Sequence, residues 1–98
     1  MSRAEKELRA LDLVMAALAH HTRRHVLLVL KARGGAMTAG EIAGRFSCRW
    51  PTVTRHLNVL QEAGLVQVEQ RGRERSYQLN EPLLNETAGR WIRRFAPK

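Results

Sequence analysis

Apolar residues recur with a helical period over the first third of the chain. Four of them, at spacings of three and four, predict a helix from about residue 5 to residue 19: Leu8, Leu11, Met15 and Leu18. A second helix is expected after Thr22, a candidate N-cap, and it would end at Gly34-Gly35. Its apolar positions are Val26, Leu27, Leu30 and Ala32.

The middle of the chain carries the signals of two short helices joined by a turn. Thr38 and Glu41 have the spacing of a capping box, in which the hydroxyl receives a free helix amide and the carboxylate reaches back. The third helix that they begin would bury Ile42, Ala43 and Phe46. Residues 47–50 are expected to form a tight turn. A fourth helix should follow from about residue 51, a proline that suits a first turn, to residue 63, and end at Gly64.

After Gly64 the period changes from helical to alternating. Residues 65–69 predict a strand with one buried face, residues 71–74 a turn, and residues 76–79 the returning strand of a hairpin. The Asn80-Glu81-Pro82 segment begins a last helix, whose apolar positions are Leu84, Ala88, Trp91 and Phe95. The predicted fold is mainly α with a small β-hairpin, in the order α-α-α-α-β-β-α, as one domain over residues 1–98.

The composition indicates a polyanionic partner. Seventeen Lys and Arg against nine Asp and Glu give a net charge of +8, and apolar residues make up 44% of the 98 residues, which is enough to fold. A single cysteine excludes an intramolecular disulfide framework and a cysteine zinc cage. Acidic residues at positions 5, 7 and 12 are untypical of a secretion signal, and no apolar run approaches the ~18 residues that span a bilayer. We therefore expect a soluble, cytoplasmic protein.

Two helices joined by a four-residue turn and followed by a basic hairpin form a winged helix-turn-helix. The chain resembles the ArsR/SmtB family of bacterial transcription repressors over nearly its whole length. The resemblance is carried, in order and at the right spacing, by Ala17-Leu18-Ala19-His20 to Thr22-Arg23-Arg24, Thr38 to Ala43, Pro51 to Leu57, Leu60 to Val66, Gly72-Arg73 and Tyr77-Gln78-Leu79. It implies a homodimer whose first and last helices (about residues 5–19 and 83–96) form the interface, with a helix-turn-helix over about 38–63 and a wing over about 65–79. It also implies that the fourth helix enters the major groove of DNA.

The pattern of the fourth helix supports that role independently. At about 100° per residue, the apolar residues Val53, Leu57 and Leu60 fall on one side, and Arg55 points nearly opposite. Arginine reads guanine, asparagine reads adenine and threonine methyls contact thymine, whereas an ordinary solvated face would carry Glu and Lys. The residues predicted to contact DNA, including three wing arginines suited to phosphates or the minor groove, are Thr38, Arg49, Trp50, Thr52, Thr54, Arg55, His56, Asn58, Arg71, Arg73 and Arg75.

The terminal helices carry more apolar residues than a monomer of this size readily buries. A purely core role would use the same residue types, but two terminal amphipathic helices favour a dimer. The predicted interface comprises Leu8, Leu11, Met15, Leu84, Trp91, Ile92 and Phe95.

The metal sites of the family are missing from this sequence. Metal-sensing members carry Cys-x-Cys on the third helix, or His and acidic ligands on the last, whereas residues 38–41 read Thr-Ala-Gly-Glu and the last helix has no His or Cys. His20, His21 and His25 cluster in sequence and three imidazoles could hold zinc, but no fourth ligand is near. We expect neither a metal nor another cofactor.

The turn before the fourth helix departs most from the family. Cys48 is expected to be a small buried hydrophobic residue; the alternative is a redox switch, since Arg45 and Arg49 would favour its thiolate. Arg49 has no side-chain oxygen with which to cap the fourth helix. Trp50 either packs onto the third helix or faces the sugar-phosphate edge of DNA, and the sequence leaves both open.

No catalytic constellation is recognisable, so an enzyme is not expected. The cysteine has no orienting base, and there is no Gly-rich phosphate loop or carboxylate pair. The leading hypothesis is a dimeric, sequence-specific repressor at a short inverted repeat of double-stranded DNA. The alternatives are a nonspecific nucleic-acid binder and a winged-helix module that binds a protein partner. The sequence does not specify the operator, and it does not separate repression from activation. The signal could be a small molecule, a protein partner, oxidation at Cys48 or none at all.

Overall fold

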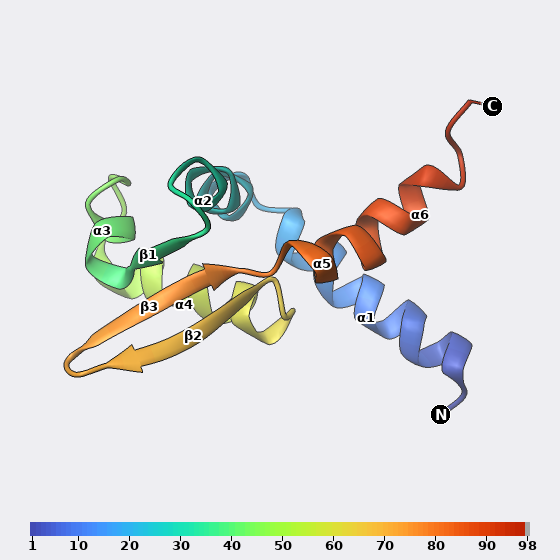
Figure 1. Ribbon diagram of the computed structural model, residues 1–98, viewed down its shortest axis with the longest axis horizontal. Helices are drawn as coiled ribbons and strands as arrows, with labels where there is room; N and C mark the ends of the chain where they lie inside the picture. Colours follow the sequence, from blue (N-terminus) through green and yellow to red (C-terminus); the bar gives the residue numbers. More distant parts are fainter. Residues whose placement is uncertain (98) are drawn as a thin grey trace.

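The elements follow the predicted order, with one additional strand. In the computed structural model, which describes residues 1–97, the chain forms an elongated molecule of 43 × 32 × 22 Å (Figure 1). Its elements are α1 (Arg3–Leu18), α2 (His21–Ala32), β1 (Ala36–Thr38), α3 (Ala39–Ala43), α4 (Trp50–Glu62), β2 (Val66–Arg71), β3 (Glu74–Leu79), α5 (Glu81–Leu84), the π-helical turn η1 (Asn85–Gly89) and α6 (Arg90–Arg93).

The junction between α1 and α2 is closed by side chains of α2. The guanidinium of Arg23 donates to the carbonyls of Ala17 (2.7 Å) and Ala16 (3.0 Å), and that of Arg24 donates to the carbonyl of Leu18 (2.7 Å). These bonds satisfy the last carbonyls of α1, which has no basic residue in its own last turn.

The cap predicted for the second helix was wrong. Thr22 lies inside α2, and the N-cap is His20, whose Nδ1 accepts a hydrogen bond from the Thr22 amide at 3.1 Å. An imidazole nitrogen at N-cap here replaces the usual side-chain oxygen, so the helix begins earlier than the pattern of capping residue types predicts.

The predicted capping box at the start of α3 is confirmed. The Thr38 hydroxyl accepts from the Glu41 amide at 3.1 Å, and the Glu41 carboxylate accepts from the Thr38 amide at 3.0 Å. The residues just before it form the unpredicted strand β1, which completes a three-stranded antiparallel sheet in the order β1-β3-β2, with Met37 opposite Tyr77 and Thr38 opposite Ser76. Three residues, of which one is buried, are too few to give a strand signal.

Helix α4 ends as predicted, at a left-handed glycine. Gly64 has φ +80°, its amide donates to the Gln61 carbonyl, and the Leu65 amide donates to the Leu60 carbonyl. The hairpin that follows has longer strands and a tighter turn than predicted. Arg71 pairs with Glu74, so only Gly72 and Arg73 form the loop, with Gly72 at φ +61°.

The last helix is interrupted by the π-helical turn η1 and ends at Arg93, so the predicted span of 83–96 was too long. The Thr87 hydroxyl donates to the carbonyl of Leu83 at 2.7 Å, within this segment. Phe95 lies in the turn beyond α6 and not on the helix.

One aliphatic core holds α1, α2, α4 and the sheet together. Its fully buried members include Leu30, Ile42, Leu57, Leu60 and Leu65, joined by Ala88 of η1. The end of the molecule with α3, α4 and the hairpin lies opposite the end where α1 and α6 diverge (Figure 1).

Candidate nucleic-acid interface

Helix α4 presents one apolar and one polar face, as its period predicts. Val53, Leu57 and Leu60 are buried, whereas Thr54, Arg55 and Asn58 are exposed, and Thr52 is half-buried. The exposed set combines a guanidinium, an amide and a hydroxyl within two helical turns. These groups have the hydrogen-bonding capacity that reading base edges requires.

His56 was wrongly placed among the outward residues. Its side chain is only 8% exposed, and its Nδ1 lies 3.3 Å from Nη1 of Arg23 on α2. The His56 and His20 rings are in contact, with centroids 4.3 Å apart. The helical period put this residue on a shoulder of α4, and the packing of α2 against that shoulder covers it.

Trp50 faces outward at the start of α4. Its side chain is 56% exposed and lines a groove of about 420 Å³ together with Thr38 of β1 and Arg73 and Arg75 of the hairpin. Ala39 and Gly40 of α3 line the same groove, so Trp50 lies beside the third helix and is also largely exposed. Arg49 is the N-cap of α4 and makes no side-chain capping bond, as its side chain predicts.

The three wing arginines do not share one environment. Arg73 and Arg75 line the groove beside Trp50, and neither forms an ion pair with any other residue in 1–97. Arg71 is paired with Glu69 (Nη2 to Oε2, 3.2 Å). Because Arg71 lies opposite Glu74 and Arg75 lies opposite Gln70, the two arginines project from opposite faces of the hairpin. Only Arg73 and Arg75 border the groove.

Thr38 also borders the groove, but its hydrogen-bonding groups serve the capping box. The amide of Thr38 and then its hydroxyl hold the pKa of Glu41 below its ordinary value. Glu74 lines the same groove and is the acidic group that an anion there would meet.

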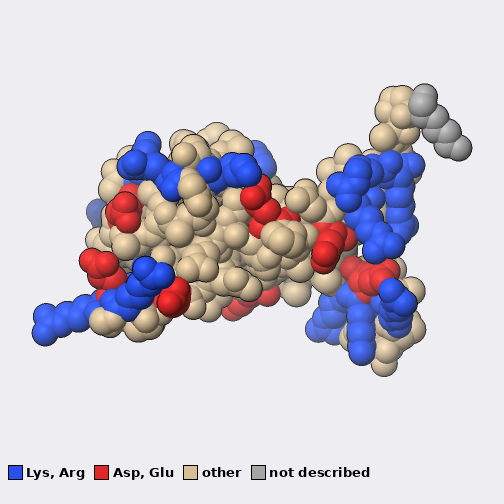
Figure 2. Space-filling view, viewed as in Figure 1, with Lys and Arg blue, Asp and Glu red and all other residues tan. Residues whose placement is uncertain are grey.

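Basic side chains gather in several places on the face that Figure 2 shows. They project from the tip of the hairpin, lie along the top of the molecule over the region of α2 and α3, and at the opposite end cover the arms formed by α1 and by η1 and α6. The charge at the hairpin end lies beside the start of α4, because Arg73 and Arg75 line the same groove as Trp50.

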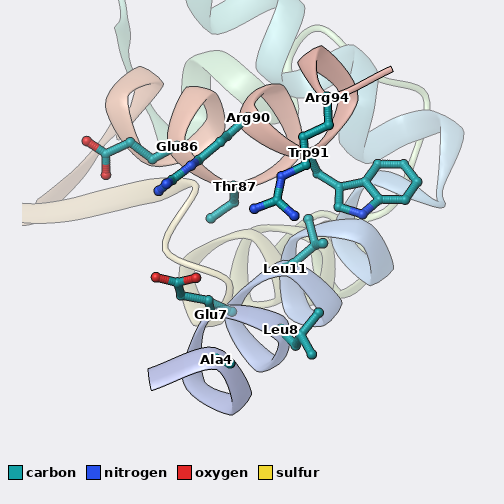
Figure 3. A pocket seen from close by; sticks show the side chains of 10 residues that line it. Ala4, Glu7, Leu8, Leu11, Glu86, Thr87, Arg90, Trp91 and Arg94 are labelled. Carbon is teal, nitrogen blue, oxygen red and sulfur yellow. The ribbon is translucent and has the colours of Figure 1, made fainter. Parts of the chain in front are cut away.

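The arms carry several of the exposed apolar residues. Leu8 and Trp91 are exposed, Ile92 is 58% and Phe95 72% exposed, and Leu11, Met15 and Leu84 are half-buried. A cavity of about 490 Å³ separates the arms, with Arg90, Trp91 and Arg94 on one side and Glu7, Leu8 and Leu11 on the other (Figure 3).

Cys48 is half-buried and packs against the core. Cys48 therefore contributes to the core without being fully buried, as the small hydrophobic residue was expected to be. Among residues 1–97, no three His, Cys, Asp or Glu side chains are grouped so that they could hold a metal ion. Within the same range no helix is long and apolar enough to cross a membrane.

Comparison with known proteins identifies the family. The helix-turn-helix domain family matches residues 18–69. The chain is similar to the transcriptional repressor SdpR of Bacillus subtilis, with 36% identity over 85 residues that cover 87% of this chain and 91% of that protein. It is also similar to the structure of an ArsR-like transcriptional regulator from Rhodococcus sp. RHA1, with 33% identity, a TM-score of 0.71, and coverage of 89% of this chain and 87% of that one. The chain belongs to the ArsR family of winged-helix transcriptional regulators.

The ArsR-family assignment makes this protein a DNA-binding transcriptional regulator. It confirms the winged helix-turn-helix predicted from the order of the elements. A further structural neighbour is described as the homodimeric winged helix-turn-helix DNA-binding domain of Mb0332 from Mycobacterium bovis. At 23% identity, a TM-score of 0.75, and coverage of 96% of this chain and 86% of that one, that likeness shows the fold.

Proposed function

We propose that this ArsR-family regulator is a dimeric, sequence-specific repressor, and not an enzyme, that binds a short inverted repeat of double-stranded DNA. It would act in the cytoplasm, where its operator is. The observation that carries the proposal is the exposed polar face of α4 beside a groove bordered by unpaired wing arginines. The similarity to the repressor SdpR supports repression as the direction of control.

Base reading is assigned to the exposed side of α4. Arg55 can donate two hydrogen bonds to guanine O6 and N7, and Asn58, one turn further along, can pair with adenine. Thr54 offers a hydroxyl and a methyl group that suits thymine. His56 has no part in this reading, because its ring is buried against α2.

The groove beside α4 would hold one sugar-phosphate strand. Arg73 and Arg75 neutralise phosphates there, and the exposed indole of Trp50 packs against the deoxyribose edge. Each phosphate neutralised adds roughly 0.9 to the slope of log affinity against log salt. The carboxylate of Glu74 repels phosphate and so weakens the attraction of the groove for any strand. Binding then depends more on the base contacts made by α4.

Dimerisation is assigned to the two arms. Exposed Leu8, Ile92 and Phe95 together with Trp91 form apolar surface that the single chain leaves open to water. Covering apolar surface yields about 25 cal/mol per Å², which favours a second copy against the arms. A two-fold axis there would set two α4 helices into major grooves about 34 Å apart. The homodimeric description of the Mycobacterium bovis neighbour supports this arrangement.

Genome-wide binding followed by footprinting tests the proposal. We expect a protected inverted repeat, an affinity at least about a thousandfold above that for random DNA, and loss of transcription from a promoter that contains the repeat. A steep salt dependence on every sequence, without a protected repeat, would instead identify a nonspecific binder. A protein that bound no DNA at low salt would be an interaction module. An increase in transcription from the promoter would refute repression but not sequence-specific DNA binding.

A further inference from the structure

Three helices meet at one guanidinium behind the proposed reading surface. Arg23, near the start of α2, holds the carbonyls of Ala16 and Ala17 at the end of α1 and also contacts Nδ1 of His56 in α4. The His56 ring contacts the ring of His20, which is the N-cap of α2. We call Arg23, His20 and His56 the basic junction. It joins the arm that is proposed to dimerise to the helix that is proposed to read DNA.

The hydrogen bonds of the basic junction fix the proton on each imidazole. Arginine can only donate, so Nδ1 of His56 accepts from Arg23. The Thr22 amide can only donate, so Nδ1 of His20 also accepts. The geometry therefore leaves Nδ1 of His56 as an acceptor and places the proton of its neutral ring on Nε2. A proton added to Nδ1 of His56 would place a donor against the donor of Arg23 and remove the bond that joins α2 to α4.

No carboxylate compensates a charge on His56. Burial lowers the pKa of His56, and the charges of His20, Arg23 and Arg55 lower it further. His20 and Arg23 come from the start of α2 and Arg55 from α4 itself, while α1 presents main-chain carbonyls that already bind Arg23. Helix α4 packs also against β2, and no acidic group of β2 or α1 is among the groups that act on His56 within residues 1–97.

We propose that the basic junction positions α4 against α1 only while the imidazole of His56 is neutral, so that acidification weakens operator binding. This inference rests on the proposed function, in which α4 reads DNA. His56 and Arg23 are then positioning residues, which touch no base and act through the orientation of α4. The junction would make the regulator responsive to acid without a ligand pocket or a metal.

The expected change of operator affinity with pH is opposite to the ordinary effect of histidine protonation. A histidine near DNA gains charge in acid and strengthens binding to phosphates. Here the proton must leave His56 before α4 takes up its reading position. Operator affinity should therefore fall by up to about tenfold for each pH unit below the pKa of His56, because one proton is then released on binding.

Operator titrations of the whole protein from about pH 8 to about pH 5.5, at constant ionic strength, test this dependence. Wild type should lose affinity in acid. His56→Gln, whose amide oxygen can still accept from Arg23, should show little pH dependence and resemble wild type at high pH. His20→Asn keeps an N-cap oxygen and should lose part of the dependence.

The matched control is His21→Gln, which removes an exposed imidazole of the same helix turn and should behave as wild type. Parallel pH profiles for wild type and His56→Gln would overturn the proposal.

Nitrogen NMR of the imidazoles in the DNA-free wild-type protein tests the basic junction separately. Near neutral pH, Nδ1 of His20 and His56 should be unprotonated, and protonation of His56 should remove its bond to Arg23. A protonated Nδ1 on His56 at neutral pH would overturn the junction, even if a His56 variant failed to fold. If no operator bound at any pH, the proposed function would fail, and these spectra would still decide whether the junction exists.

Discussion

Arg55 is the residue on which base discrimination should depend most. It is exposed on the side of α4 opposite the core, and its guanidinium forms no ion pair within residues 1–97. Arg55→Ala should lose about 1–3 kcal/mol of discrimination at one base pair of each half-site, because a bidentate contact to guanine would be removed. Competition binding with operators substituted at single positions would measure this loss. An unchanged preference at every position would refute the orientation proposed for α4.

The wing arginines should differ from Arg55 and from one another. Arg73→Ala and Arg75→Ala should weaken binding to all sequences about equally and each reduce the salt slope by roughly 0.9, because phosphates carry no sequence information. Arg71→Ala is the matched control, since Arg71 lies on the other hairpin face and is paired with Glu69. Affinity measured at several salt concentrations would separate the three. An equal effect of Arg71→Ala would show that the groove is not the phosphate site.

Acid should destabilise the fold in two pH windows. The pKa of His56 is lowered by folding from an ordinary value of 6.5, so its contribution to the free energy of unfolding is complete above that value and is lost as the pH falls below it. The pKa of Glu41 is also lowered, from 4.5, so the contribution of its capping bond is present above that value and is lost below it. Thermal unfolding across this range would detect both losses. His56→Gln should abolish the upper one and Glu41→Gln the lower, and a wild-type melting temperature that stayed constant from neutral pH to pH 4.5 would contradict the assignment to His56.

For single residues, the sequence predicted which side chains of α4 face outward, with one error. A period of 100° per residue separates Val53 from Arg55 clearly, because they lie on opposite sides. It assigns His56 to a boundary, where burial depends on whether a neighbouring helix covers it. Arg23 and His20 provide that cover, and they lie more than thirty positions earlier in the chain. No local pattern contains this information.

Among the elements, the end of α4 is the most constrained. A Cβ on Gly64 would lie 2.6 Å from Cδ2 of Leu83, and the φ of +80° disfavours any other residue. Gly64→Ala should reduce the free energy of unfolding by about the 1–2 kcal/mol that a left-handed backbone costs, plus a small further amount because the end of the Leu83 side chain must also move. Denaturant unfolding gives the comparison.

Gly72→Ala is the control for this contact. Gly72 also has a positive φ, of +61°, but nothing lies within 4 Å of its added Cβ, so only the backbone cost should be seen. In a Leu83→Ala background, the excess cost of Gly64→Ala should disappear. If Gly64→Ala and Gly72→Ala were equally destabilising in the parent protein, the contact between Gly64 and Leu83 would not matter.

Elements that begin or end at a capping residue or a glycine close in the chain were predicted from sequence. A strand that forms only by pairing with distant residues was missed. The capping box of Thr38 and Glu41 and the terminal Gly64 act through residues close in the chain. Strand β1 exists because Ala36–Thr38 find β3 some forty residues later, and its own sequence carries no strand period. The π-helical turn at Asn85–Gly89 likewise has no signature in the apolar spacing.

For the whole molecule, the arms make a prediction about assembly. Ile92→Asp should convert a dimer to a folded monomer, because the side chain is 58% exposed in the single chain and a charge there would disrupt only an interface. Operator affinity should fall by about a hundredfold or more, since two linked half-sites bind far more tightly than one. Light scattering and far-UV circular dichroism would report mass and fold.

Leu28→Asp provides the comparison for this variant. Leu28 is 69% exposed on α2, outside the proposed interface, and its substitution should leave the mass unchanged. A dimer that persisted in Ile92→Asp, or one that dissociated equally in Leu28→Asp, would place the interface elsewhere. The composition of the terminal helices was enough to predict that they bind a partner. The sequence did not show which of their faces stays uncovered, because that depends on how α1 packs against η1.

Strand β1 has one more consequence, for the shape of the DNA. It ends in Thr38, the N-cap of α3, and is hydrogen-bonded to β3 of the hairpin, so α3 and the hairpin are parts of one sheet-linked body. The base of the hairpin is also held near the end of α4, because the Asn80 amide donates to the carbonyl of Leu65 at 2.9 Å. A rigid protein leaves bending to the duplex, and easily kinked pyrimidine–purine steps lower the cost of that bending. Base pairs that no side chain touches would therefore contribute to operator choice through their stiffness.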